Sequence, residues 1–342
     1  MEKNTAAASV QNTLQNKLQN EPAGVSTATA NDMAQITSAS KAASAGYNVP
    51  EMSPPDQPEF KRPSQAKEIW RRFKKSKGAL IGLVLLVFLI LILVVGPLVV
   101  PYEQATTQDF ASMLTGPSSG HLFGCDGFGR DIFARVIYGG RTSVSIALIA
   151  TATSCIFGSM LGAIAGFFGG KVDTIIMRGL DIFMSVPDIL FTMAVVYALG
   201  PNFVNLVVAL TLAYFTNYVR LVRAQVLTLS EADYVEASRA GGAGSLRIIL
   251  THILPNSVGV IIVNTTLNVA KIILYESTLS YLGLGMPPPA PEWGAMLSEA
   301  REFLRNSPHM MLFPAAAIVL TACAINLVGD GLRDALDPQL KS

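Results

Sequence analysis

The chain has 342 residues, of which 51% are hydrophobic and only 14% charged, and its mean hydropathy is +0.43. This composition excludes a disordered protein and is too apolar for most soluble enzymes. The net charge of +1 gives no overall field that would attract nucleic acid, so nucleic acid is not expected among the partners.

The first part of the chain, residues 1–67, is rich in Ala, Ser, Thr, Asn and Gln, with prolines clustered near its end. No apolar periodicity runs through it, so we predict a disordered cytoplasmic tail that acts as a solvated spacer. The first 30 residues contain no hydrophobic stretch, which argues against a cleavable secretory signal.

Long apolar runs dominate the rest of the chain. A basic flank, Trp70–Lys77, precedes an uncharged run of 23 residues, Gly78–Val100, which as a helix of about 35 Å is long enough to span a bilayer. Five more runs lie near 143–168, 174–199, 203–223, 257–282 and 310–329. The run at 174–199 is the weakest, because charged residues and Pro187 interrupt its first half. We therefore predict an all-α polytopic membrane protein with six transmembrane helices.

These runs divide the chain and orient it. The predicted divisions are the tail at 1–67, the basic flank and first helix at 68–102, an outer loop at 103–142, a membrane core at 143–329 with a connecting loop at 224–256, and a second cytoplasmic tail at 330–342. Loops on the side of the N-terminus hold sixteen Lys and Arg residues, against five on the opposite side. This asymmetry predicts that both termini and the 224–256 loop are cytoplasmic.

The connecting loop carries two short helical patterns between two apolar runs. Ser230 is predicted to cap the first, and Gly241 with Gly242 to end it, because glycine tolerates the left-handed conformation past a helix C-terminus. Ser245 is predicted to cap the second helix, and Pro255 to end it.

This loop resembles the EAA loop of ABC-transporter permeases, whose pattern is E-A-A-x-x-x-G, nine residues, then I-x-L-P. Ser238 stands in place of the third residue and His252 in place of the isoleucine, and both departures are mild because a small residue remains at 238 and Ile253 is adjacent. Glu236, Ala237, Ser238, Gly242, Leu254 and Pro255 fill the pattern, and the resemblance implies that these residues, together with Tyr234, couple to the ATPase.

The resemblance implies a type I ABC importer permease core in which coupling helices between membrane helices 4 and 5 dock on a separate ATPase. ATP and magnesium would then be bound by one or two ATP-binding subunits, and this chain would have no cofactor and no catalytic residue of its own. The alternative interpretation of the loop is an amphipathic turn that joins two membrane helices without any partner.

Three further segments resemble the oligopeptide, dipeptide and nickel branch of these importers: His121–Arg141, Leu279–Leu297 and Asn326–Leu340. The second is similar to the C-type permease subunit. The resemblance implies a heterodimer with a second homologous permease in the cytoplasmic membrane, supplied by an extracellular or periplasmic peptide-binding protein. Peptides are the implied substrate, and nickel or another small solute is the alternative.

Two loop segments contain residue types that occur in ligand sites. Gly166–Lys171 lacks the spacing of a Walker A loop, so it is interpreted as a turn between helices. Asp126, Arg130 and Asp131 lie among glycines but without the alternating ligands of an EF-hand, which favours a turn braced by Asp–Arg pairing over a calcium site. Trp293 belongs to the last outer loop.

Polar residues inside the fifth apolar run have two open interpretations. Lys271 and Glu276, with Asn264 and Asn268, would line the translocation pathway or contact the second permease. Alternatively, Lys271 snorkels or pairs locally, and Glu276 lies in the membrane interface. An ion-coupled secondary carrier using Lys271 and Glu276 as relays, and a membrane scaffold without transport activity, are the competing functions.

The nucleophilic and metal-ligating residue types are scattered. Cys125, Cys155 and Cys323 show no ligand or Cys-x-x-Cys spacing, and Cys125 is a lone thiol in a predicted outer loop. The three histidines form neither a triad nor a metal pattern. We expect no metal site and no hydrolytic chemistry in this chain.

Overall fold

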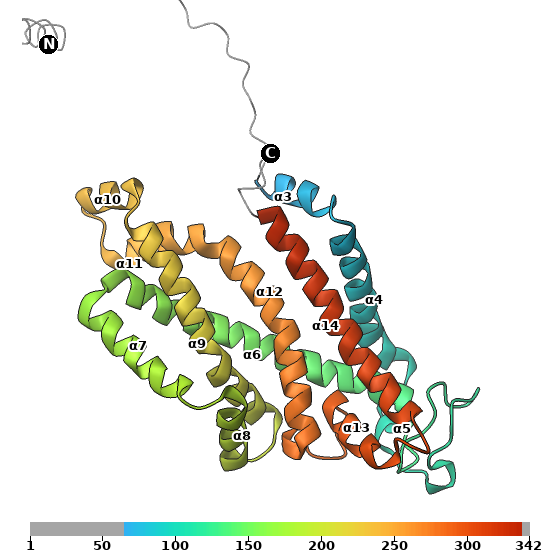
Figure 1. Cartoon of the computed structure of the whole chain (residues 1–342). Helices are drawn as coiled ribbons and strands as arrows, with labels where there is room; N and C mark the ends of the chain where they lie inside the picture. The colour runs from blue at the N-terminus through green and yellow to red at the C-terminus, as the bar shows by residue number, and fades with distance from the viewer. Residues whose placement is uncertain (1–64, 337–342) are drawn as a thin grey trace, which may run out of the picture. The chain divides into compact units, whose positions relative to one another are not determined.

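The structure is a computed structural model that describes residues 65–336, and all its regular elements are helical (Figure 1). Almost all of the predicted tail at 1–67, and the last residues of the predicted tail at 330–342, lie outside the described part. The α-helices are α3 Gln65–Phe73, α4 Lys77–Val99, α5 Tyr102–Thr106, α6 Ile132–Phe168, α7 Gly170–Met184, α8 Asp188–Leu199, α9 Phe203–Ser230, α10 Asp233–Ala240, α11 Ser245–Ile248, α12 Leu254–Leu279, α13 Trp293–Ala300 and α14 His309–Leu336. Short 3-10 helices lie at Phe110–Ser112 and Arg301–Phe303, and π-helical turns at Ile249–Ile253 and Ser280–Leu284.

Five helical stretches among the described residues are long and apolar enough to cross a membrane, and the count is six if the bent pair α7–α8 forms one span. They are Lys77–Val99, Ile132–Phe168, Phe203–Ser230, Ser245–Leu284 and His309–Leu336. The prediction of an all-α polytopic protein is confirmed. α6 begins at Ile132, inside the segment predicted as an outer loop at 103–142, and the Asp131 side chain caps it.

The apolar run at 174–199 is not one helix. It forms α7 and α8, which meet at an angle of 82° across the break at Ser185–Pro187. Proline disfavours a helical conformation at the preceding residue and has no N–H to donate, so the chain turns at Val186–Pro187 and a new helix begins at Asp188. The single straight span expected from the apolar count is therefore corrected to a bent pair.

Small residues let α6 and α9 approach closely. A Cβ atom placed on Gly158 would lie 2.5 Å from Cβ of Tyr218, and one on Gly162 would lie 2.5 Å from the carbonyl oxygen of Val219. The hydroxyls of Thr153 and Thr211 lie 2.6 Å apart across the same contact. Close backbone approach of this kind, with hydroxyl groups bridging the helices, is how membrane helices gain packing energy without a hydrophobic drive between them.

The last helix, α14, packs against the first elements of the described chain. Gly82 faces it so closely that an added Cβ would lie 2.5 Å from Cβ of Leu327. Nearer its C-terminus, Ala335 joins Phe73 and Ala79 in a small buried apolar cluster. These contacts tie α3 and α4 to the C-terminal part of α14.

The described helices form a bundle with different short elements at its two ends. Figure 1 shows α3, α10 and α11 at one end, together with the C-terminal end of α14. The short elements α5, α8 and α13 lie at the opposite end (Figure 1). The EAA-like segment and the basic flank therefore share one side of the helix bundle.

Candidate coupling site

The first half of the EAA-like segment is α10, which follows α9 after a two-residue break. The predicted Ser230 cap is wrong, because Ser230 is the last residue of α9 and its hydroxyl donates backwards to the carbonyl oxygen of Leu227 at 3.0 Å. Ala232 occupies the cap position instead, without a side-chain hydrogen bond. The helical pattern of α9 thus extends further than its apolar run indicated.

The end of α10 is built as predicted, on glycine. Gly242 has φ of +80°, and its N–H donates to the carbonyl oxygen of Arg239 at 2.9 Å. The next N–H, of Ala243, donates to the carbonyl oxygen of Ser238 at 3.1 Å. This pair of bonds is a Schellman motif, in which the residue with positive φ is usually glycine because a Cβ atom is disfavoured there. Gly242 therefore sets the direction in which the chain leaves α10.

The second half of the segment continues into the membrane helix without a stop, so the prediction that Pro255 ends the helix is wrong. From Ser245 the chain runs through α11, a π-helical turn and α12 as one stretch of 40 residues ending at Leu284. The N–H of Leu254 donates to the carbonyl oxygen of Ile249, five residues back, and the extra residue in this turn accommodates the missing N–H of Pro255. The predicted Ser245 cap is also absent, since Gly244 holds that position.

One face of the segment is anchored by buried apolar side chains. Val235 of α10, Ile248 of α11 and Ile253 of the π-helical turn are all buried to 1% exposure or less. They pack in one cluster with Val222 and Val226 of α9 and with Ala163 of α6. Burying each such side chain contributes about 2 kcal/mol, so the segment is held firmly on the two membrane helices.

The other face is left open. Tyr234, Leu246 and Leu250 expose 42%, 69% and 54% of their surface. Between them Glu236 and Ala237 are exposed, and Glu236 makes no hydrogen bond or ion pair with any residue in the described range. We call Tyr234, Glu236, Ala237, Leu246 and Leu250 the open face. It combines an unpaired carboxylate with apolar surface, which is the composition expected of a docking surface.

Side-chain contacts connect α10 to α12 and to α6. The amide of Asn256 donates to the Tyr234 hydroxyl at 3.4 Å, which connects α10 to the start of α12. The guanidinium of Arg239 lies 5.0 Å from the ring centroid of Phe167 at the end of α6. The structure thus brings the predicted residues of α10 close to Leu254 and Pro255, which are half-buried and exposed, respectively.

The predicted polar residues of the fifth run are not all brought together. The amide of Asn268 donates to Asn264 at 2.8 Å, and Asn264 also lines a cavity of about 640 Å³ between α9, α12 and α14. Lys271 is exposed and makes no ion pair with any residue from 65 to 336. The structure therefore joins the two asparagines and leaves the lysine apart.

Glu276 lies inside the protein. It is fully buried, as is Glu292 beside it, and the Ser277 hydroxyl donates to Glu276 at 3.3 Å. Its carboxyl is enclosed by protein in the described chain. Lys271 is exposed and Glu276 is enclosed, and the two form no ion pair with each other.

Comparisons with known proteins agree with the resemblance. Residues 158–342 match the family described as binding-protein-dependent transport system inner membrane component, and residues 64–117 match the N-terminal transmembrane domain of oligopeptide transport permease C. The chain belongs to this permease family. It is a multi-pass inner-membrane permease of the ABC-transporter class, as the EAA-like segment indicated.

Named relatives cover most of the permease. A dipeptide transport system permease of Alkalihalophilus pseudofirmus is 42% identical over 290 residues, which cover 85% of this chain and 95% of the relative. A di/tripeptide permease of Pseudomonas aeruginosa is 41% identical, with coverage of 85% and 97%. A glutathione permease of Pectobacterium atrosepticum is also 41% identical, with coverage of 81% and 92%.

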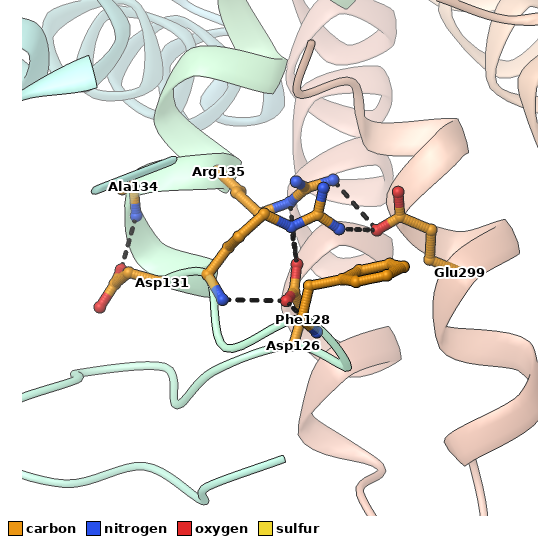
Figure 2. A network of polar contacts seen from close by, with 7 residues as sticks. Asp126, Phe128, Asp131, Ala134, Arg135 and Glu299 are labelled. Atoms are coloured by element: carbon orange, nitrogen blue, oxygen red, sulfur yellow. Dashed lines mark hydrogen bonds and ion pairs between the residues drawn. The ribbon is translucent and has the colours of Figure 1, made fainter. Parts of the chain in front are cut away.

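At the opposite end, the permease holds a buried ionic network that connects the loop before α6 to α13 (Figure 2). Arg130 donates to Asp126 at 2.7 Å and to Glu299 at 2.5 Å, and Arg135 donates to the same oxygen of Glu299 at 3.1 Å. The predicted Asp126–Arg130 pairing is present. Arg135 and Glu299 were missed, because Glu299 lies 169 residues from Arg130 along the chain.

The carboxylates of Asp126 and Asp131 accept hydrogen bonds from nearby backbone N–H groups, so they are not free to bind a cation. The second oxygen of Asp126 accepts the N–H groups of Phe128 at 2.9 Å and Arg130 at 3.0 Å. Asp131 caps α6 by accepting the N–H of Ala134 at 2.8 Å (Figure 2). In the part of the chain that the structure describes, no group of three or more acidic, His or Cys side chains is placed to hold a metal ion.

Trp293 and Cys125 also lie at the end of the bundle that carries α13. Trp293 begins α13, is buried to 1% exposure, and donates its indole N–H to the carbonyl oxygen of Val136 at 2.9 Å. The residue before it, Glu292, accepts hydrogen bonds from the Ser280 hydroxyl and from the N–H of Met286. Cys125 is a buried free thiol, and burial raises its pKa, so it is protonated and unreactive at neutral pH.

Proposed function

We propose that the chain is the membrane subunit of an ATP-driven importer of peptides, and that the open face of the α10–α11 segment docks on a separate ATP-binding subunit. The observation that carries the proposal is the contrast within this segment. Its buried face is fixed on α6 and α9, whereas Glu236 and the apolar side chains beside it are exposed and unpaired. The names of the relatives support peptides as the substrate class.

The proposed assembly contains this chain and three further components. A second homologous permease completes the pathway, one or two ATP-binding subunits hold ATP and magnesium, and a peptide-binding protein delivers the substrate to the end that carries α13. This arrangement requires both termini and the α10–α11 segment to be cytoplasmic, which the Lys and Arg distribution supports.

Force would pass from the ATP-binding subunit into the membrane through rigid connections. A push on α10 acts on α9 and α6 through the apolar cluster of Val235 and Ile248. It acts on α12 directly, because helical structure is continuous from Ser245 to the end of α12 at Leu279. Arg223 of α9 and Asp173 of α7 form two hydrogen bonds, of 2.5 and 2.7 Å, which extend the connection to the bent pair α7–α8. Interfaces packed in this way move as units between discrete arrangements.

The cavity between α9, α12 and α14 fits the cytoplasmic half of the pathway. Its lining is mainly apolar, with Asn256, Asn264 and Arg333 as hydrogen-bonding groups. This mixture suits a substrate whose backbone is polar and whose side chains vary. Asn268 lies next to this cavity through its bond to Asn264, and we assign Lys271 to the surface that contacts the second permease or lipid.

Competing functions make different predictions. A nickel or other small-solute importer would share the whole assembly and differ only in substrate, so competition by unlabelled peptide separates it from a peptide importer. An ion-coupled carrier would transport without ATP in vesicles that have a gradient. A scaffold would show no uptake under either condition and no co-purifying ATPase.

The direct test is uptake of a labelled dipeptide into proteoliposomes that contain the complete complex. Glu236→Ala removes the unpaired carboxylate without touching the buried cluster, so uptake should fall at least about tenfold while the protein level in the membrane is unchanged. Glu231→Ala is the matched control, since Glu231 is also exposed in the same connection but outside α10. Equal uptake by both variants would contradict the coupling role.

A further inference from the structure

The short helix α3 has a protein-facing side that fixes its position. Phe73 is buried to 5% exposure, and it packs with Ile69 against Leu332 and Ala335 near the C-terminal end of α14. Gly331 leaves room for this contact, since an added Cβ there would lie 3.2 Å from the Phe73 ring. The helix is therefore held by apolar packing and cannot turn freely about its axis.

Beside this packed side, α3 and the turn that follows it carry a stripe of cations around Trp70, whose ring stacks on Phe73 with the centroids 5.8 Å apart. Lys67, Trp70, Arg71 and Lys74 follow the i, i+3, i+4, i+7 spacing of one helix face, and all four are exposed. Trp70 exposes 48% of its surface, and the Lys74 ammonium lies 5.0 Å from its ring centroid. We call these four residues the basic stripe. Exposed tryptophan is unusual on a surface that faces only water, and is typical of the headgroup region of a bilayer.

The position of the basic stripe along the chain agrees with that environment. α3 ends at Phe73, a short turn follows, and the membrane-spanning α4 begins at Lys77, where the Ser76 hydroxyl accepts the N–H of Ala79 at 3.3 Å. The apolar residues of α4 face outward from its first turn, with Leu80 and Ile81 exposed by 36% and 63%. The stripe therefore lies directly before the helix whose outer surface lipid chains would cover.

We propose that the basic stripe of α3 binds anionic phospholipid headgroups, with the Trp70 ring seated at the level of the headgroups. Cations close to a membrane surface attract anionic lipid, and an aromatic ring at the interface fixes the depth of the helix. The packing of Phe73 on α14 would then anchor one end of α14 at the bilayer surface. The basic stripe would hold α14 in place while the open face at the same end of the bundle engages its partner.

The experiment uses the fluorescence of Trp70 in the full chain. The protein has two tryptophans, so Trp293→Phe leaves Trp70 as the sole emitter. The variant is placed in nanodiscs of phosphatidylcholine that contain a fixed fraction of either brominated phosphatidylglycerol or brominated phosphatidylcholine, because bromine quenches only a nearby indole. If Trp293→Phe does not fold, subtracting the signal of Trp70→Phe from that of the unsubstituted chain gives the same quantity.

The proposal predicts that brominated phosphatidylglycerol quenches Trp70 at least about threefold more strongly than brominated phosphatidylcholine at equal fraction, and that added salt reduces the difference. The triple variant Lys67→Gln, Arg71→Gln, Lys74→Gln should abolish the preference. A matched triple variant at the exposed cations Arg141, Lys171 and Arg305 should keep it.

Three results would overturn the proposal. Equal quenching by the two lipids would show that charge does not recruit lipid here. A preference that survives the Lys67, Arg71 and Lys74 triple variant would place the lipid site elsewhere. No quenching by either lipid, with full quenching by aqueous acrylamide, would show that the stripe faces water and serves a soluble partner instead.

Discussion

The two ends of this permease differ in whether their charged side chains are paired and buried. At the α13 end, Asp126, Arg130, Arg135 and Glu299 form a network in which the first three side chains are buried to 4% exposure or less. At the α10 end, Glu236 is exposed and unpaired within the described chain, beside apolar side chains that are also open. One end is closed by its own contacts, and the other leaves a carboxylate and apolar side chains exposed, as the proposed docking requires.

This difference follows from energetics. A charge enclosed in protein must be paired, because an unpaired buried charge costs several kcal/mol. A charge that must engage and release a partner cannot be paired internally, and it contributes little to the stability of the free chain. Substitutions at the α13 end should therefore affect folding, and those at the α10 end should affect transport.

The largest expected effect is at the ionic network. Arg135→Ala leaves Glu299 and Asp126 with one guanidinium between them in a buried site, so the free energy of unfolding should fall by about 3–5 kcal/mol. Arg141→Ala, an exposed position on the same helix, should change it by less than about 0.5 kcal/mol. Thermal unfolding in detergent compares the two. Equal unfolding midpoints for Arg135→Ala and Arg141→Ala would show that the ionic network does not stabilise the α13 end.

A smaller loss of stability is expected at Glu292. Its carboxylate accepts from the Ser280 hydroxyl and from the N–H of Met286 in a fully buried site. Glu292→Ala leaves these donors unsatisfied, which should destabilise the protein by about 2–4 kcal/mol. The control is Glu302→Ala, because Glu302 is exposed in the 3-10 helix that follows α13. An unfolding midpoint for Glu292→Ala that matches the control would show that the hydrogen bonds do not support this end.

The smallest effect on stability, with a clear effect on transport, is expected at Gly242. Its φ of +80° costs about 1 kcal/mol for alanine, although a Cβ there would meet no neighbouring atom within 4 Å. Gly242→Ala should therefore redirect the α10–α11 connection and lower uptake without unfolding the protein. Gly241→Ala tests the reason, because Gly241 has φ of −74° and should tolerate the change. Similar uptake by both variants would show that the Schellman turn is not needed.

Much of this organisation could be predicted from the sequence. Long apolar runs indicated α4, α9, α12 and α14, since length and apolar composition decide whether a helix spans a membrane. The resemblance carried by Glu236, Gly242 and Pro255 predicts the coupling role, which stays a prediction. The turn at Gly242 could be predicted locally, because helices often end at a glycine with positive φ.

Features that depend on tertiary contacts were not predicted. The apolar count at 174–199 did not show that Pro187 would produce a bend of 82°. Pro255 looked like a helix stop, but a π-helical turn accommodates it when the flanking helices are held by Ile248 and Ile253. Glu299 and Glu292 gave no signal, because their partners lie in distant segments or across an irregular loop.

The central claim is that the open face of α10–α11 contacts the ATP-binding subunit. A photoreactive benzoylphenylalanine placed at Leu246, which exposes 69% of its surface, tests it in the assembled complex, with Leu304 at the opposite end, 49% exposed, as the control. The account predicts a covalent adduct with the ATP-binding subunit from position 246 and none from position 304. An adduct from position 304, or its absence from position 246 in a complex that transports peptide, would contradict it.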